Sequence, residues 1–181
     1  MSSTVARSAS LAAAAALALA SASSGPASAA GRAGCDSPQS HQFDFWVGRW
    51  RVTPTGEPAR HVADSLIEKL YLGCGVRENW MPLKGGPGGS LNAYVPADKG
   101  WRQTWVDSGG AYVEFKGGWT GRAMVLTGRW PQPGHPDQLT RMTYTRGADG
   151  SVRQLGEVSD DRGRTWQPGF DFTYRRDTAV R

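Results

Sequence analysis

The chain has few of the residues that build metal centres. Its 181 residues include two cysteines and three histidines. His41, His61 and His135 lie far apart in the sequence, with no H-x-x-x-H spacing. A protein metal site needs three or four ligands that converge on the ion. The adjacent carboxylates Asp160 and Asp161 fall in a predicted turn. The sequence therefore predicts no metal site.

Other absences count against further classes of protein, a Ser/His/Asp hydrolase among them. No Gly-x-Ser-x-Gly motif of a nucleophile elbow is present. The formal net charge is +5, but only Arg175 and Arg176 are adjacent cations. Nucleic-acid binding requires a concentrated basic surface, so no nucleic-acid partner is predicted. After the first 30 residues there is no long apolar run, so we expect no integral membrane span.

The N-terminal segment has the pattern of a secretory signal peptide. Arg7 is its one charged residue, an apolar run follows from Leu11 to Ala20, and Ala27-Ser28-Ala29 forms a small-residue cleavage site. We expect residues 1–29 to be removed and residues 30–181 to form one secreted or periplasmic domain. A disordered Ala/Ser tail or a transit peptide is the alternative.

The two cysteines, Cys35 and Cys74, are each other's only intramolecular partners. In an exported chain such a pair predicts a disulfide. It would join the start of the domain to the beginning of its third strand. Two free buried thiols are the alternative. Lipidation of Cys35 is not expected, because Arg32 occupies a position where a lipoprotein signal has an aliphatic residue.

The domain has no long segment of helical period and many short runs rich in β-branched and aromatic residues. Gly, Pro, Asn and Asp clusters separate these runs, which indicates an all-β antiparallel barrel or sandwich of about ten strands. The predicted strands are 49–53, 60–70, 76–81, 90–95, 101–107, 111–116, 122–130, 139–146, 152–159 and 166–175.

One short helix is predicted over 39–47, where Phe43, Trp46 and Val47 share one helical face. Glycines make 84–89 a flexible loop, and three prolines mark a loop over 131–136. Residues 159–166 fit S-x-D-x-G-x-T-W, an Asp-box hairpin in which the aspartate caps turn amides. A single copy predicts a rigid hairpin rather than a sialidase propeller.

Amphipathic residues with polar tips recur on single strand faces. Such faces are typical of the wall of a semi-polar ligand cavity, and equally of an outer face in contact with water. The three faces consist of Val76, Glu78 and Trp80; Ser90, Asn92 and Tyr94; and Gln103, Trp105 and Asp107.

The segment FDFWVGRWRV, residues 43–52, resembles the start of calycin-type barrels, the lipocalins and fatty-acid-binding proteins. In those barrels the tryptophan of Gly-x-Trp closes one end. The mature chain is also similar, over nearly its full length, to an uncharacterised family of secreted bacterial proteins with a lipocalin-like barrel. The matching motifs are Gly73-Cys74, Glu78-Asn79-Trp80, the segment WRQTWVD at 101–107 and the segment DRGRTW at 161–166.

A weaker likeness runs to nitrobindin-type barrels, which bind haem through a strand histidine. The three histidines of this chain do not lie on its late strands, so neither haem nor any other cofactor is predicted.

These patterns support three hypotheses about function. The first is a secreted carrier of a small, partly apolar molecule. The second is a small barrel enzyme with Glu78 as its general base. The third is a packed barrel that acts as an envelope-associated interaction module. A buried Glu78 should be paired, and Arg141 is a candidate partner. The predicted ligand-binding residues are Glu78, Trp80, Asn92, Tyr94, Trp101, Gln103 and Trp105.

Overall fold

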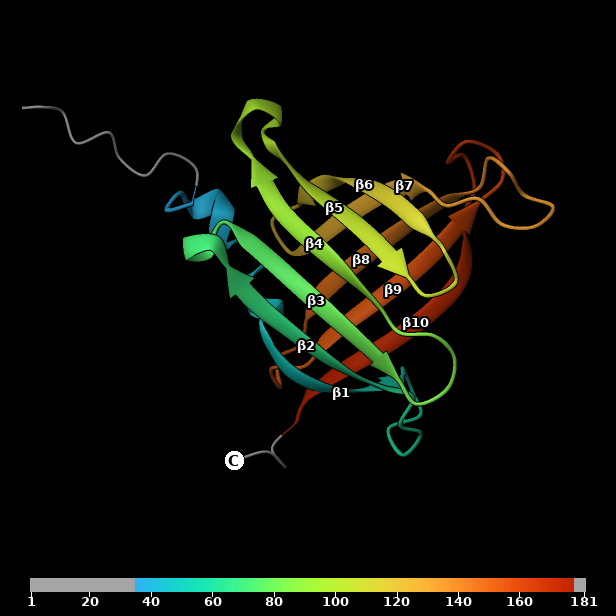
Figure 1. Ribbon diagram of the computed structural model, residues 1–181, viewed down its shortest axis with the longest axis horizontal. Coiled ribbons are helices and arrows are strands. Elements are labelled where there is room, and N and C mark those ends of the chain that lie inside the picture. Colours follow the sequence, from blue (N-terminus) through green and yellow to red (C-terminus); the bar gives the residue numbers. More distant parts are fainter. Residues whose placement is uncertain (1–34, 178–181) are drawn as a thin grey trace, which may run out of the picture. The chain divides into compact units, whose positions relative to one another are not determined.

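The computed structural model describes residues 35–177, and the predicted signal peptide lies outside them. Ten antiparallel strands close into a barrel, each paired with the next in the chain and β1 paired with β10 (Figure 1). This confirms the predicted fold. The strands are β1 (Gly48–Pro54), β2 (Ala63–Leu70), β3 (Gly75–Pro82), β4 (Gly88–Val95), β5 (Gly100–Asp107), β6 (Tyr112–Trp119), β7 (Ala123–Arg129), β8 (Leu139–Arg146), β9 (Val152–Ser159) and β10 (Gln167–Arg176).

The N-terminal helix differs from its prediction. Two short 3₁₀ helices, η1 (Pro38–His41) and η2 (Asp44–Trp46), replace one helix over 39–47. Phe43 leaves helical geometry between them, with φ −106° and ψ 5°, and Val47 is extended. Phe43 and Trp46 still lie together, with their rings stacked at 4.9 Å between centroids. We call residues 38–46 the plug. Two other 3₁₀ turns, η3 (Tyr71–Gly73) and η4 (Pro96–Asp98), connect strands.

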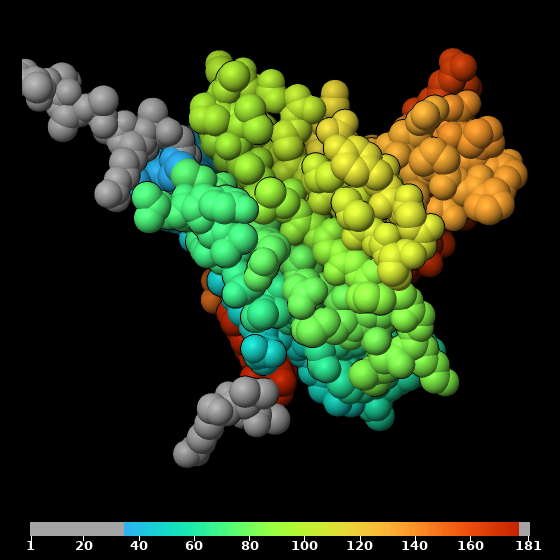
Figure 2. Space-filling view, in the orientation of Figure 1, coloured from blue at the N-terminus to red at the C-terminus, as the bar shows by residue number. Residues whose placement is uncertain are grey.

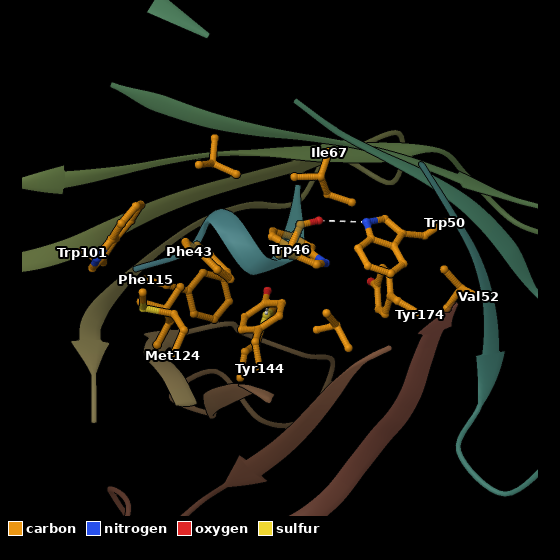
Figure 3. Close-up of a cluster of buried hydrophobic side chains, with 14 of the residues drawn as sticks. Phe43, Trp46, Trp50, Val52, Ile67, Trp101, Phe115, Met124, Tyr144 and Tyr174 are labelled. Atoms are coloured by element: carbon orange, nitrogen blue, oxygen red, sulfur yellow. Dashed lines mark hydrogen bonds between the residues drawn. The ribbon is translucent and has the colours of Figure 1, made fainter. Parts of the chain in front are cut away.

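The plug fills one end of the barrel with aromatic rings. Phe43 and Trp46 have no exposed surface. The Phe43 ring centroid lies 5.6 Å from that of Trp101 and 5.0 Å from that of Tyr144. The indole of Trp50 donates to the carbonyl of Trp46 at 2.8 Å, so β1 is bonded to the plug (Figure 3).

A disulfide joins Cys35 to Cys74, as predicted, with 4.7 Å between the two Cα atoms. It fixes the chain just before the plug to the turn that precedes β3. The alternative of two free thiols is therefore wrong. Among the described residues, no helix is long and apolar enough to cross a bilayer.

Trp50, the tryptophan of the Gly-x-Trp step, lies fully buried at the plugged end. The guanidinium of Arg176 lies 4.1 Å from the centroid of the Trp50 ring and donates to the carbonyl of Val47 at 2.8 Å. A Cβ on Gly48 would lie 1.6 Å from Arg176 Nη1. Gly48 has φ +147°, so glycine both permits this backbone and leaves room for the arginine.

The closed barrel fixes which strand faces point inward. On β4, Ser90 and Asn92 are buried, whereas Leu91 is 44% exposed. On the neighbouring β5, Gln103 is buried and Val106 is 50% exposed. The polar faces seen in the sequence therefore form the inner wall of the barrel, and aliphatic residues of these strands contact water.

Candidate functional site

The barrel is hollow at the end opposite the plug. A cavity of about 150 Å³ lies there. The loops β1–β2, β3–β4, β5–β6, β7–β8 and β9–β10 surround this end (Figure 1). In the space-filling view, the loop after β7 projects in orange at one end and the blue N-terminal segment lies at the other (Figure 2). A cavity of this volume can hold a single-ring molecule such as benzene.

Aromatic side chains form the outer part of the cavity. Each of them is partly exposed, which shows that this end is open. They form two groups. In the first, the ring centroid of Phe172 lies 5.7 Å from that of Trp80 and 5.3 Å from that of Phe170. In the second, the ring centroids of Trp105 and Trp130 are 6.2 Å apart. Such rings offer flat apolar surface to a ligand.

The inner part of the cavity, which we call the floor, is polar. The residues of the floor are Glu78, Gln103, Met142, Tyr144, Gln154 and Tyr174. They come from β3, β5, β8, β9 and β10, and all except Met142 carry a side-chain oxygen or nitrogen that takes part in one hydrogen-bond network. Strands distant in sequence are thus joined around one small space.

The network closes into a ring. Gln103 donates to Asn92 Oδ1 at 2.7 Å and to Tyr144 Oη at 3.3 Å. Gln154 donates to Tyr144 Oη at 3.1 Å and accepts from Tyr174 Oη at 2.6 Å. Asn92 then leads back to the carboxylate of β3 through Ser90, to which it donates at 3.0 Å. A closed network of this kind holds its side chains in one arrangement.

Glu78 is the acid in this ring. Its carboxylate accepts from Ser65 Oγ at 2.9 Å and from Ser90 Oγ at 3.4 Å, and Tyr174 Oη, whose single proton is shared with Gln154 Oε1, lies 3.4 Å from it. The side chain is 4% exposed. Burial raises the pKa of Glu78 from 4.5 to about 7, and the three hydroxyls lower it only in part. A carboxyl group with such a pKa changes charge near neutral pH.

Arg141 is not the partner of Glu78, contrary to the prediction. It pairs with Glu157 at 2.8 Å, and its guanidinium stacks 4.2 Å from the centroid of the Trp166 ring. The reason is register: Arg141 and Glu157 are opposite each other on β8 and β9 and lie on the outer face, whereas Thr140 and Met142 face inward. None of the residues that line the cavity is a lysine, arginine or histidine.

One acceptor in the floor has no partner. Gln103 is 2% exposed, yet its Oε1 accepts no hydrogen bond. Within residues 35–177, the only other buried side-chain polar atom of this kind is Trp46 Nε1, in the plug. A buried acceptor without a donor costs free energy. Gln103 Oε1 is itself inaccessible to solvent, so it stays unsatisfied behind the surface of the cavity.

The seven predicted ligand-binding residues fall in three places. Glu78, Trp80, Gln103 and Trp105 line the cavity. Asn92 lies behind them, bonded to Gln103 and to the carbonyl of Val76. The structure places the other two at the plugged end.

Trp101 and Tyr94 lie opposite each other near the β4–β5 turn. The indole of Trp101 donates to Gln42 Oε1 at 3.2 Å, and its ring packs on Phe43. Neither residue is among those that line the cavity. They share inner strand faces with the cavity residues, but lie further along the barrel axis.

Sequence reasoning missed seven of the eleven residues that line the cavity. The missed residues are Trp130, Met142, Tyr144, Gln154, Phe170, Phe172 and Tyr174. The alternation of Phe170, Phe172 and Tyr174 on the last strand is a period-two signal that could have identified three of them. Trp130 follows β7 directly, and its position beside a turn gives no signal of a cavity.

The Asp-box segment forms the predicted hairpin between β9 and β10. Asp161 accepts from the amides of Arg164 and Thr165, both at 2.9 Å, and from Thr165 Oγ1 at 2.7 Å. These hydrogen bonds lower the pKa of Asp161 to about 2. The indole of Trp166 donates to the carbonyl of Gly163 at 3.1 Å. This segment has a structural role, as expected.

The histidines lie outside the cavity. His41 pairs with Asp44, His61 with Asp64 and His135 with Asp160. In the part of the chain that the structure describes, no cluster of three or more His, Cys, Asp or Glu side chains is arranged to hold a metal ion.

No protein-family model matches the chain. No curated protein is significantly similar to it in sequence. The candidate site therefore stands on its own geometry.

Proposed function

We propose that this protein is exported and binds a small, partly apolar molecule in the open end of its barrel. The observation that carries the proposal is the division of the cavity into an aromatic mouth and a polar floor. Ligand sites in proteins combine apolar surface with a few fixed polar groups that orient the ligand. Here the hydrogen-bonded ring fixes those groups before a ligand arrives.

The contrast between the two barrel ends supports this proposal. At the plugged end, Phe43, Trp46 and Trp101 fill the interior. At the other end, the rings of Trp80, Trp105 and their neighbours line a cavity. The packed-barrel hypothesis requires an interior that is filled throughout, and this barrel has an unfilled end.

A location outside the cytoplasm fits the chemistry of the domain. The domain contains the Cys35–Cys74 disulfide, and disulfides persist in oxidising compartments but are rare in the cytosol. The signal-peptide pattern of residues 1–29 and the resemblance to secreted lipocalin-like proteins favour the same location. A soluble carrier or scavenger outside the cytoplasm is the role we propose.

Titration of intrinsic tryptophan fluorescence with toluene, phenol and benzyl alcohol tests the proposal. We expect at least one of these probes to give a saturable change, because Trp80, Trp105 and Trp130 line the cavity. Met142→Trp should fill the cavity and abolish the change. Met142→Leu keeps the volume of the side chain and should retain it. Failure of every probe, or equal binding by both variants, would contradict the proposal.

An enzyme with Glu78 as general base is a second candidate. The observation that favours it is a buried carboxyl group, within a cavity, whose pKa is raised to about 7. A general base works best when its pKa is near the operating pH. For any substrate that is found, Glu78→Gln should abolish turnover while neutral probes still bind. Turnover equal to that of the wild type would end this hypothesis.

A further inference from the structure

We infer that the ligand is a small organic cation, whose ammonium group lies against Glu78 and whose apolar part lies between the aromatic rings. This inference rests on the proposed function and names the chemical class of its ligand. Three independent features of the cavity carry it: the balance of hydrogen-bond donors and acceptors, the charge, and the aromatic walls.

The amide donors of the floor are already used. Both N–H groups of Gln103 are donated, to Asn92 and Tyr144. Those of Gln154 are donated to Tyr144 and to Met142 Sδ. A ligand that only accepts would therefore find no free amide donor in the floor, whereas the carboxylate of Glu78 can accept from a ligand that donates.

The charge of the floor is uncompensated. Glu78 is the one residue lining the cavity with a side chain that ionises near neutral pH. The other titratable groups that face it are the hydroxyls of Tyr144 on β8 and Tyr174 on β10, whose pKa values are raised by burial. Ser65 on β2 and Ser90 on β4 contribute neutral hydroxyls. A buried carboxylate without a counter-charge is unfavourable, and a cationic ligand supplies that counter-charge.

The aromatic walls suit the same ligand. The faces of tryptophan and phenylalanine rings attract cations, and quaternary ammonium and methyl-lysine groups are recognised by cages of such rings. Trp80 and Phe172 lie on one side of the cavity, and Trp105 and Trp130 on another. The volume of about 150 Å³ limits the apolar part to about one ring.

A neutral carbonyl ligand gives the opposite pH dependence. It could accept a hydrogen bond only from the protonated carboxyl group of Glu78, so it would bind more tightly as the pH falls. A cation requires the carboxylate and would bind more tightly as the pH rises. The direction of this dependence therefore distinguishes the two ligand classes.

The experiment uses three probes of nearly equal shape: benzylammonium, benzyl alcohol and benzoate. Their dissociation constants are measured by calorimetry, with the disulfide intact, at pH 5 and pH 8. We expect benzylammonium to bind at least tenfold more tightly than benzyl alcohol at pH 8. Its affinity should fall by up to about tenfold for each pH unit below 7, as Glu78 is protonated.

Glu78→Gln removes the charge and should abolish both the preference for the cation and its pH dependence. Glu68→Gln is the matched control, since Glu68 pairs with Arg77 on the outer face of the barrel, and it should change neither.

Each outcome decides between the proposals. Equal binding of benzylammonium and benzyl alcohol without pH dependence, or tighter binding of benzoate, overturns the cation inference and leaves the binding function in place. Binding of benzyl alcohol that strengthens at low pH has the same consequence. Failure of all three probes and of toluene overturns the binding function itself.

Discussion

The hydroxyl oxygen of Tyr174 lies 3.4 Å from Oε1 of Glu78, although the two residues are 96 positions apart in the chain. Tyr174 is on β10, which pairs with β1, and Glu78 is on β3. Inside the closed barrel their contact passes over β1 and β2, which lie between β10 and β3 in the sheet. It also places a neutral phenol, and no cation, against a buried acid.

The first prediction concerns the pH dependence of stability. The pKa of Glu78 is about 7 in the folded state and near 4.5 when unfolded. Between these values the folded state binds more protons than the unfolded state, so Glu78 makes stability fall as the pH rises from 4.5 to 7. We expect Glu78→Gln to be more stable than the wild type at pH 8, by roughly 3 kcal/mol, and similar at pH 4.

Urea unfolding of both proteins across this range measures the difference. Subtracting the wild-type value from the variant value cancels the contributions of the other titratable groups. One of these is Asp161, whose lowered pKa stabilises the fold until acid protonates its carboxylate. Glu68→Gln, on the outer face, should show no such gain. A gap between Glu78→Gln and the wild type that is the same at pH 4 and pH 8 would contradict the buried, unpaired state of Glu78.

The second prediction separates two tryptophans on one strand face. Trp101 is 2% exposed and packs on the plug, whereas Trp105 is partly exposed and lines the cavity. Trp101→Ala should therefore cost about 3–5 kcal/mol of unfolding free energy. Trp105→Ala should cost about 1–2 kcal/mol and should weaken probe binding at least tenfold.

Chemical unfolding and probe titration of both variants check this division. Probe binding by Trp101→Ala is measured without denaturant, at a temperature at which the variant is still folded. Loss of binding in Trp101→Ala with retention in Trp105→Ala would reverse the assignment of the two residues.

The third prediction concerns closure of the plugged end. Gly48→Ala would push Arg176 away from Trp50, because its Cβ would lie 1.6 Å from the guanidinium. We expect it to lower stability by about 2–3 kcal/mol. Arg176→Ala should cost about 1–2 kcal/mol, since it removes the contact with Trp50 and the hydrogen bond to Val47.

The double variant gives the decisive value. With Arg176 absent, the clash disappears and Gly48→Ala retains only the cost of its positive φ, so the combined loss should be smaller than the sum of the two. Strict additivity in thermal or urea unfolding would show that Gly48 and Arg176 act independently.

The fourth prediction concerns the disulfide. Cys35 and Cys74 are separated by 39 residues, and their bond holds the segment that leads into the plug. The double substitution to serine should lower stability by about 2–4 kcal/mol. Hydrogen exchange should increase first at Phe43 and Trp46. An unchanged unfolding midpoint under reducing conditions would contradict this role.

Much of the barrel could be predicted because each strand carries a period-two pattern and ends at a turn signal. The predicted ranges for 101–107, 139–146 and 152–159 differ from the observed strands by at most one residue. Errors occurred where glycine or proline obscured the pattern. Gly88 was assigned to a loop but begins β4. Glycine occupies this strand position because a Cβ there would lie 2.7 Å from the ring of Trp105.

The candidate site could be predicted only in part. The alternation along a strand predicts which side chains point into the barrel, but it does not predict how far along the barrel axis each of them lies. Glu78, Gln103 and Trp101 all point inward, yet only the first two line the cavity. The plug determines that difference, and its position depends on contacts between residues far apart, such as Phe43 with Tyr144. The partner of Arg141 likewise depends on strand register.

If the open end of the barrel receives a ligand, methionine-methyl NMR should detect it at one methionine and not at another. Met142 lines the cavity, whereas Met124 is fully buried outside it. On titration with benzyl alcohol, we expect a saturable shift of the Met142 methyl signal and an unchanged Met124 signal. No shift of Met142 up to the solubility limit of the probe, or equal non-saturating shifts of both signals, would contradict this expectation.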